Sequence, residues 1–171
     1  GFIVKGAAMD TPLGWLENAT FSGTFNNRID TCGVPGDANT KFTFNKLSAD
    51  WNKITLKSDL LEISNLQNPV LSCDLKSDFA LTNLNTLGES ATIQFIEGTG
   101  KLDIHYYGSI AKEDTVRPVL NGVMSLHEAT MHYLPRDLIF KECSGDIEFT
   151  QQDVILKSLK ATVGNSSFTM D

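Results

Sequence analysis

The sequence contains few cysteines, which could cross-link the chain, and few prolines, which would interrupt strands and helices. It contains three cysteines, Cys32, Cys73 and Cys143, and five prolines in 171 residues. An odd number of widely spaced cysteines without a C-x-x-C pair argues against a zinc site and permits at most one disulfide. Cys73 and Cys143 fall on the apolar side of alternating segments, so we interpret them as buried thiols. The sequence leaves the disulfide status of all three cysteines open.

Basic residues are outnumbered and scattered. Lys and Arg total 14 against 21 Asp and Glu, which gives a net charge of −7. Binding to a phosphate backbone needs clustered positive charge, so we expect no nucleic-acid partner. The sequence also has no signal peptide and no apolar run of the roughly 20 residues that a membrane-spanning helix needs.

The two ends of the sequence resemble internal segments. The chain opens with GFIVKG, inside an apolar run and without Met, and it closes with SSFTMD, inside an alternating segment. We therefore expect residues 1–171 to be a fragment of a longer protein, with any targeting or anchoring segment outside them.

Clusters of reactive side chains are also missing. None of the three histidines has the spacing of a metal pair on one strand face. No serine lies in a G-x-S-x-G motif, and the GTG at residues 98–100 precedes a predicted strand rather than the helix of a phosphate loop. Asp146 and Glu148 share the polar face of a predicted strand, where solvated charges are a simpler interpretation than acid–base catalysis. The sequence therefore predicts no catalytic residue, no metal ligand and no cofactor.

Period-two alternation is what the sequence has in abundance. In NATFSGTFN (18–26) the side chains of Phe21 and Phe25 share one face, and those of Thr20, Ser22 and Thr24 share the other. The same alternation recurs along most of the chain, which predicts about ten to twelve short strands joined by Gly, Pro, Asn and Asp turns.

Two segments depart from regular alternation. The strand in LNGVMSLHEATMHYLPRDLIF changes phase near Glu128. Leucines recur every three residues at Leu81, Leu84 and Leu87, with Gly88 after them, which predicts one short helix near 80–88.

These patterns predict an all-β fold for residues 1–171 as a single β-rich domain. We expect a repetitive antiparallel meander that forms a long curved sheet or trough. A two-sheet sandwich is the alternative, because strict alternation leaves an apolar face that a second sheet could cover.

The C-terminal stretch CSGDIEFTQQDVILKSLKATVGNSSFTMD (143–171) loosely repeats an earlier one, FTFNKLSADWNKITLKSDLLEISNLQNPVLSCDLKS. Each contains an alternating strand, a polar turn, a second strand, a small turn and a third strand. Such repetition of hairpins is typical of a meander that extends itself. We expect Gly145 and Gly164 to permit close packing or bulges within it.

The region from about residue 70 to residue 171 resembles the C-terminal region of AsmA-like proteins, whereas residues 1–69 match only as further alternating strands. The resemblance begins with DFALTNLNTLG and the glycine-led strand GTGKLDIHYYG. It continues in a phrase of alternating apolar positions that this sequence carries at Ser144, Gly145, Ile147, Phe149, Asp153, Ile155, Leu159, Gly164, Ser166, Phe168 and Met170.

The resemblance implies a non-enzymatic segment of a cell-envelope protein. AsmA-like proteins are similar to TamB and to bridge-like lipid-transfer proteins, and carry an N-terminal membrane anchor and a long β-sheet with an apolar concave face. It implies a location in the periplasm of a Gram-negative bacterium, and a role in outer-membrane biogenesis and phospholipid movement between membranes. It also implies phospholipid and the neighbouring β-repeats of the full-length protein as partners.

The apolar face supplies the candidate binding residues, because acyl chains could occupy it in place of a missing core. The candidates as a set are Phe21, Phe25, Phe42, Phe44, Leu102, Ile104, Tyr106, Ile147, Phe149 and Phe168. The alternative function is a β-sandwich adhesion or carbohydrate-binding module that uses exposed Trp15, Trp51 or Tyr107 as a platform. We also expect exposed strand edges, and therefore an edge-strand dimer.

Overall fold

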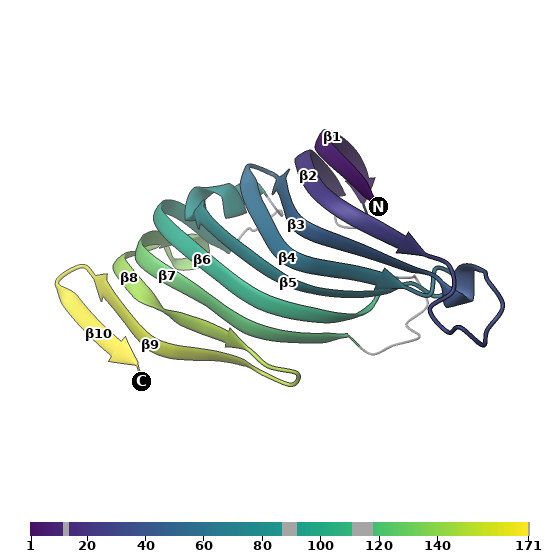
Figure 1. The fold of residues 1–171 in the computed structure, drawn as a ribbon. Coiled ribbons are helices and arrows are strands. Elements are labelled where there is room, and N and C mark those ends of the chain that lie inside the picture. Colours follow the sequence, from purple (N-terminus) through teal and green to yellow (C-terminus); the bar gives the residue numbers. More distant parts are fainter. Residues whose placement is uncertain (12–13, 87–91, 111–117, 171) are drawn as a thin grey trace. The chain divides into compact units, whose positions relative to one another are not determined.

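The computed structural model describes residues 1–11, 14–86, 92–110 and 118–170 of the chain, and most of them lie in strands (Figure 1). The described strands are β1 (Phe2–Thr11), β2 (Gly14–Asn26), β3 (Lys41–Trp51), β4 (Ile54–Ser64), β5 (Val70–Ala80), β6 (Ile93–Ser109), β7 (Val119–Tyr133), β8 (Leu138–Phe149), β9 (Val154–Val163) and β10 (Ser166–Met170).

All ten described strands form one sheet, in the order in which they follow each other along the chain. Pairing is antiparallel in β1–β2, β2–β3, β4–β5, β7–β8, β8–β9 and β9–β10. The predicted all-β antiparallel meander is therefore confirmed, with a strand count at the low end of the expected range. The alternative of a two-sheet sandwich is wrong, because one sheet takes up every described strand.

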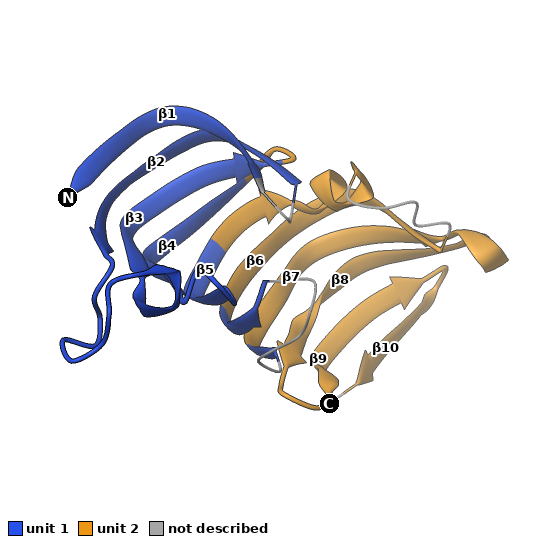
Figure 2. Ribbon diagram, turned by 90° about the vertical axis from the view of Figure 1, so that its right-hand side faces the viewer, with its two compact units in different colours: residues 1–51, 55–76, 105–120 blue, residues 52–54, 77–104, 121–171 orange. Residues whose placement is uncertain are grey.

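The chain divides into two compact units (Figure 2). Unit 1 comprises residues 1–51, 55–76 and 105–120, and unit 2 comprises residues 52–54, 77–104 and 121–171. β1, β2 and β3 lie wholly in unit 1, and β8, β9 and β10 wholly in unit 2.

Helical structure in the described residues is limited to three 3-10 segments, η1 (Asp37–Asn39), η2 (Leu81–Thr86) and η3 (Leu134–Arg136). The predicted helix near 80–88 is confirmed as η2, with Leu87 and Gly88 outside the described residues. Its Leu81 is fully buried, and the side chain of Asn85 receives a hydrogen bond from the Phe95 backbone N–H (2.9 Å) and donates one to the Phe95 carbonyl (2.8 Å). This exchange ties η2 to β6. No helix in the described ranges is long and apolar enough to cross a membrane.

The two-residue hairpin turns have the backbone conformations that such turns require. Asn52 and Lys53, between β3 and β4, both have positive φ, 47° and 65°. Two consecutive positive φ values define the turn whose twist matches that of the flanking strands. Gly164, between β9 and β10, has φ +59° with open space around its missing Cβ. Gly164 therefore allows the backbone conformation of the turn. Gly145 allows close packing of β8 against β9, since a Cβ at residue 145 would lie 2.9 Å from the Leu159 Cα.

Bulges interrupt the ladders within both units. In unit 2, Glu128 on β7 and Glu142 on β8 have φ values of 49° and 53°, and the β7–β8 register shifts between Leu126 and Ala129. The predicted phase change near Glu128 is this bulge, because one extra residue returns the next side chain to the apolar face. The residues that follow the two bulges, Ala129 and Cys143, are fully buried.

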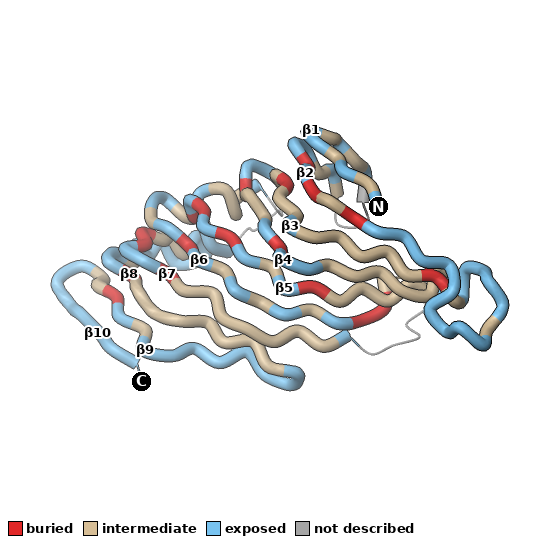
Figure 3. The backbone as a smooth tube through the Cα atoms, in the orientation of Figure 1, coloured by how far each residue is buried: buried red, intermediate tan, exposed pale blue. Residues whose placement is uncertain are grey.

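Unit 1 repeats this arrangement at Asn18 on β2, where φ is 53° and the following Ala19 is fully buried. Ala19, Phe21 and Ala49 form a small core, against which Phe2, Val4, Ala7, Met9, Leu16, Phe44 and Leu47 pack. Buried residues occur as short stretches within the strands, separated by longer half-buried or exposed stretches (Figure 3). The apolar residues of β1–β3 are thus packed in a small local cluster.

Candidate functional site

The candidate site in unit 1 is a group of five phenylalanine rings on the apolar face of β1, β2 and β3. Phe21 and Phe44 meet edge-to-face at a ring-centroid distance of 5.2 Å, and Phe2 lies 6.1 Å from Phe21 and 6.3 Å from Phe44. Phe42 stacks on Phe44 at 6.0 Å and contacts Phe25 at 4.8 Å. We name these five residues the aromatic cluster. Edge-to-face and offset pairs of this kind stabilise beyond the area that they bury.

Gly23 on β2 is the position around which the aromatic cluster assembles. It lies opposite Phe2 on β1 and opposite Phe44 on β3. A Cβ built at Gly23 would lie 2.5 Å from Cζ of Phe2, so the Phe2 ring occupies the space that any side chain at residue 23 would need. Alternation places Phe21 and Phe25 on either side of this glycine, and the whole cluster follows from that register.

The rings of the aromatic cluster differ in their exposure to solvent. Phe21 is only 8% exposed, whereas Phe25 at the end of β2 is 53% exposed. Phe2, Phe42 and Phe44 are half-buried. The cluster is therefore closed at Phe21 and open at Phe25, which leaves an aromatic surface available to an apolar ligand.

The candidate site in unit 2 is a set of aliphatic and aromatic rows across β7, β8 and β9. Ile147 pairs with Met124 on one side and with Leu156 on the other. Phe149 pairs in the same way with Gly122 and with Val154. Cross-strand neighbours in register share a face, so these rows form a continuous apolar strip, the β7–β9 strip. Ile147 and Phe149 are half-buried, while Val154 and Leu156 are exposed.

The last hairpin extends the apolar face of unit 2. Phe168 on β10 pairs with Ala161 on β9, and its ring meets that of Phe140 on β8 edge-to-face at 6.1 Å. Phe168 thus lies opposite the small, buried Ala161 and remains 39% exposed.

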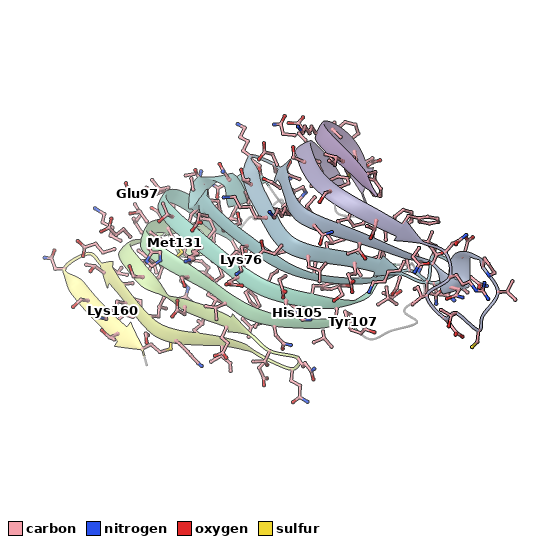
Figure 4. All side chains as sticks on the ribbon, viewed as in Figure 1. Lys76, Glu97, His105, Tyr107, Met131 and Lys160 are labelled. Carbon is pink, nitrogen blue, oxygen red and sulfur yellow. The ribbon has the colours of Figure 1, made fainter. Side chains whose placement is uncertain are left out.

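Along β6 the expected division of faces is confirmed. Leu102, Ile104 and Tyr106 are half-buried, and the intervening Lys101, Asp103 and His105 are exposed. The Tyr106 hydroxyl donates to the Ser109 carbonyl at 3.2 Å. His105 Nδ1 lies 2.8 Å from Asp74 Oδ1 on the polar face, and Figure 4 labels it beside Tyr107 on the same strand.

Acidic side chains gather in one part of unit 2. An open cleft of about 680 Å³ in unit 2 is lined in part by Glu97, Glu128 and Glu142. Thr130 donates a hydrogen bond to Glu97 at 2.7 Å there. Within the described ranges no group of three His, Cys, Asp or Glu side chains is placed to hold a metal ion.

Three side chains have displaced pKa values, each for a structural reason. The Asp50 carboxylate accepts a hydrogen bond from the Asn18 side chain at 2.9 Å and another from the Thr55 hydroxyl at 2.7 Å. These two hydrogen bonds lower the pKa of Asp50, and the opposing effect of burial is smaller. Burial, assisted by the charge of Asp74, raises the pKa of the Cys73 thiol to about 11. Burial also raises the pKa of the Cys143 thiol. The buried thiols expected at these two positions are confirmed, and all three cysteines are free.

The structure brings the predicted candidates together in groups. Phe21, Phe25, Phe42 and Phe44 meet in the aromatic cluster of unit 1, and Ile147 and Phe149 lie in the β7–β9 strip of unit 2. Sequence reasoning omitted Phe2 and Phe140, which are the aromatic partners of Phe21 and of Phe168. The alternating segments around Phe2 and Phe140 are too short to single these residues out. Only the cross-strand register, which the sequence does not show, places them beside their partners.

The tryptophans of the alternative binding platform lie on opposite faces. Trp15 pairs with Asp10, and the next residue, Leu16, pairs with Trp51. Since neighbouring side chains on a strand point to opposite faces, Trp51 shares the face of Leu16 and not that of Trp15. Trp15 and Tyr107 are exposed, and Trp51 is half-buried.

Comparison of the chain with protein-family models, with curated proteins and with solved structures finds no match.

Proposed function

We propose that this chain is a non-enzymatic segment of an AsmA-like cell-envelope protein whose apolar sheet face contacts the acyl chains of phospholipids. The proposed location is the periplasm of a Gram-negative bacterium, in a parent protein anchored by a transmembrane helix outside residues 1–171. The proposed roles are outer-membrane biogenesis and lipid transport between membranes. The single observation that carries the proposal is an apolar face that no second layer of described strands covers.

The physical case begins with exposure. A soluble sheet normally buries its apolar face against another layer. Here Phe25 in unit 1 and Val154, Leu156 and Phe168 in unit 2 remain exposed on that face. Exposed apolar side chains that follow each other in register are a typical sign of a surface that binds something apolar.

The energetics suit a lipid tail. Each methylene moved out of water gains about 0.8 kcal/mol, so an acyl chain along several strands would bind without a specific polar contact. A phospholipid headgroup could remain in water at the margin of the sheet. This mode of binding agrees with the described polar side chains, which form pairs such as Lys41–Glu62 and Lys157–Glu148 rather than a headgroup site.

The test uses phosphatidylethanolamine and phosphatidylglycerol vesicles that contain a phospholipid with a photoreactive diazirine on its acyl chain. After irradiation, mass spectrometry of the peptides locates the crosslinks. We expect crosslinks at the aromatic cluster and at the β7–β9 strip, and few on the opposite face. Crosslinks spread evenly over both faces, or absent from the apolar face, would refute lipid contact there.

A pair of neighbouring substitutions sharpens this test. Phe25→Glu places a charge on the exposed end of the aromatic cluster, whereas Thr24→Glu places the same charge on the opposite face. Burying an ionised carboxylate against acyl chains is costly, so Phe25→Glu should reduce crosslinking at the cluster about tenfold while Thr24→Glu leaves it unchanged. Equal effects would indicate a general charge effect.

The carbohydrate-binding alternative makes a different prediction. Specific binding on a glycan array that is lost in Trp51→Ala, in protein that captures no phospholipid, would favour it. The separation of Trp15 and Trp51 on two faces does not support a platform built from both.

A further inference from the structure

The hairpin turn between β7 and β8 exposes large apolar side chains. Leu134 in η3 is 41% exposed, and Leu138 and Ile139 at the start of β8 are 37% and 42% exposed. The turn has a defined conformation, because the Asp137 backbone N–H donates to the Leu134 carbonyl at 3.3 Å. We name residues 133–139 the β7–β8 tip. Its apolar side chains are therefore presented to solvent by a turn that is already ordered, which lowers the entropy cost of binding.

The apolar side chains of the β7–β8 tip lie on both faces of the sheet. Tyr133 pairs with Leu138, and His132 pairs with Ile139. Since successive side chains on a strand point to opposite faces, Leu138 and Ile139 expose apolar surface on the two sides of one hairpin. A protein that packed on one face would leave the other side chain in water. A hairpin that enters an apolar medium buries both.

Two neighbouring turns in unit 2 are polar. β9 and β10 are joined by Gly164 and Asn165, and this turn lies at the same end of the strands as the β7–β8 tip, since Phe140 pairs with Val163. β8 and β9 are joined at the opposite end by TQQD, residues 150–153. The exposed apolar surface is thus a property of one hairpin and not of the turns in general.

The polar side chains of the β7–β8 tip suit the headgroup region of a bilayer. Arg136 is exposed on η3, and a guanidinium can donate two parallel hydrogen bonds to a phosphate. Asp137 is the only acidic residue of the tip, and its Oδ1 lies 2.7 Å from His132 Nε2 on β7. Tyr133 is half-buried at the base of the tip, and tyrosine is enriched where proteins cross the membrane–water interface.

We propose that the β7–β8 tip is a membrane-docking surface. It inserts Leu134, Leu138 and Ile139 shallowly into the interface of a phospholipid bilayer and places Arg136 against a lipid phosphate. Three aliphatic side chains and one cation give a weak, reversible attachment. The proposal goes beyond lipid contact with the apolar sheet face, because the tip binds an intact bilayer whether or not that face takes up a lipid.

Flotation with phosphatidylethanolamine and phosphatidylglycerol vesicles tests the surface. Leu134→Glu should lower the vesicle partition coefficient at least about tenfold, because an ionised carboxylate is costly to move into the interface. Asn165→Glu is the matched control, since it adds the same charge to the neighbouring polar turn and should leave partitioning unchanged. Circular dichroism checks that both variants keep their strands.

Three outcomes of the flotation would overturn the proposal. The first is a wild type that does not float with the vesicles, and the second is an equal loss in Leu134→Glu and Asn165→Glu. The third is flotation that survives Leu134→Glu and is lost in Phe25→Glu, which would place the bilayer contact on the apolar sheet face and leave the proposed function intact.

A depth measurement tests insertion directly. In a Cys32→Ser background, which removes the exposed thiol, Pro135→Cys and Asn165→Cys each carry an environment-sensitive NBD fluorophore. Vesicles with brominated acyl chains should remove at least about half of the emission at residue 135 and little of that at residue 165, because only the β7–β8 tip reaches the acyl boundary. Equal quenching at the two positions, or none at residue 135, would contradict insertion of the tip.

Discussion

β1–β3 in unit 1 and β8–β10 in unit 2 start from the same alternating pattern and cover their apolar faces to different degrees. In β1–β3 five phenylalanine rings form the aromatic cluster, the Phe2 ring lies over Gly23, and Phe21 is 8% exposed. In β8–β10 Phe140 and Phe168 form one aromatic pair, and Val154 and Leu156 on β9 remain exposed. The first group of strands buries Phe21 among its rings, and the second leaves Val154, Leu156 and Phe168 exposed.

The difference shows how a single sheet can be stable and still offer an apolar surface. A glycine within a strand normally weakens it, but at Gly23 the Phe2 ring fills the space of the missing side chain. The Phe2 ring over Gly23 thus takes the place of part of a second layer. Where the facing residues are aliphatic or small, as beside Ala161, less of the face is covered.

The largest expected effect comes from truncating one ring in each region. Phe21→Ala removes a buried ring with two aromatic partners and should lower the free energy of unfolding by about 3 kcal/mol. Phe168→Ala removes a ring that is 39% exposed, and should cost about 1 kcal/mol. Urea denaturation followed by circular dichroism measures both. Equal losses would contradict the distinction between a covered and an open region.

A smaller effect concerns the side chains beside the bulges. Asp50 accepts hydrogen bonds from Asn18 at the β2 bulge and from Thr55, and its pKa is lowered. A lowered pKa in the folded state contributes stability above the unfolded value of about 3.9, and this contribution is lost as the pH falls through the folded pKa. Asp50→Asn should therefore destabilise the protein at pH 7, and the gap to wild type should close on acidification.

Unit 2 supplies the control for this pH dependence. At the β7 bulge the Glu128 backbone N–H donates to the Ser144 hydroxyl at 3.1 Å, a contact with a group that does not titrate in this range. Ser144→Ala should cause a loss of stability that stays constant between pH 7 and pH 4. If the stability difference between Asp50→Asn and wild type were also constant with pH, the charge of Asp50 would not be its cause.

The smallest effect is a difference in thiol reactivity that leaves stability unchanged. Cys32 lies exposed in the loop between β2 and β3, whereas Cys73 in unit 1 and Cys143 in unit 2 are buried. With the pKa of Cys73 raised to about 11, only about one molecule in ten thousand would carry its thiolate at pH 7. Iodoacetamide should label Cys32 first, and label the other two after unfolding. Early labelling of Cys143 would show that unit 2 opens more readily than unit 1.

Much of the local structure could be predicted from residue order alone. Alternation assigned Phe21 and Phe25 to one face, placed Leu102 and Ile104 opposite Lys101 and Asp103, and located the phase change at Glu128. The helix near residue 81 followed from leucine spacing. The cross-strand contacts were not predictable in this way, because Phe2 meets Phe21 and Phe44 only through a register set by two bulged ladders.

The sequence by itself determined that the chain is all-β and which side chains share a face, because successive side chains on a strand necessarily point in opposite directions. The tertiary structure decided that all described strands enter one sheet and that Gly23 is covered by a ring. Those outcomes depend on which strand pairs with which and in what register, a choice made by contacts between distant residues.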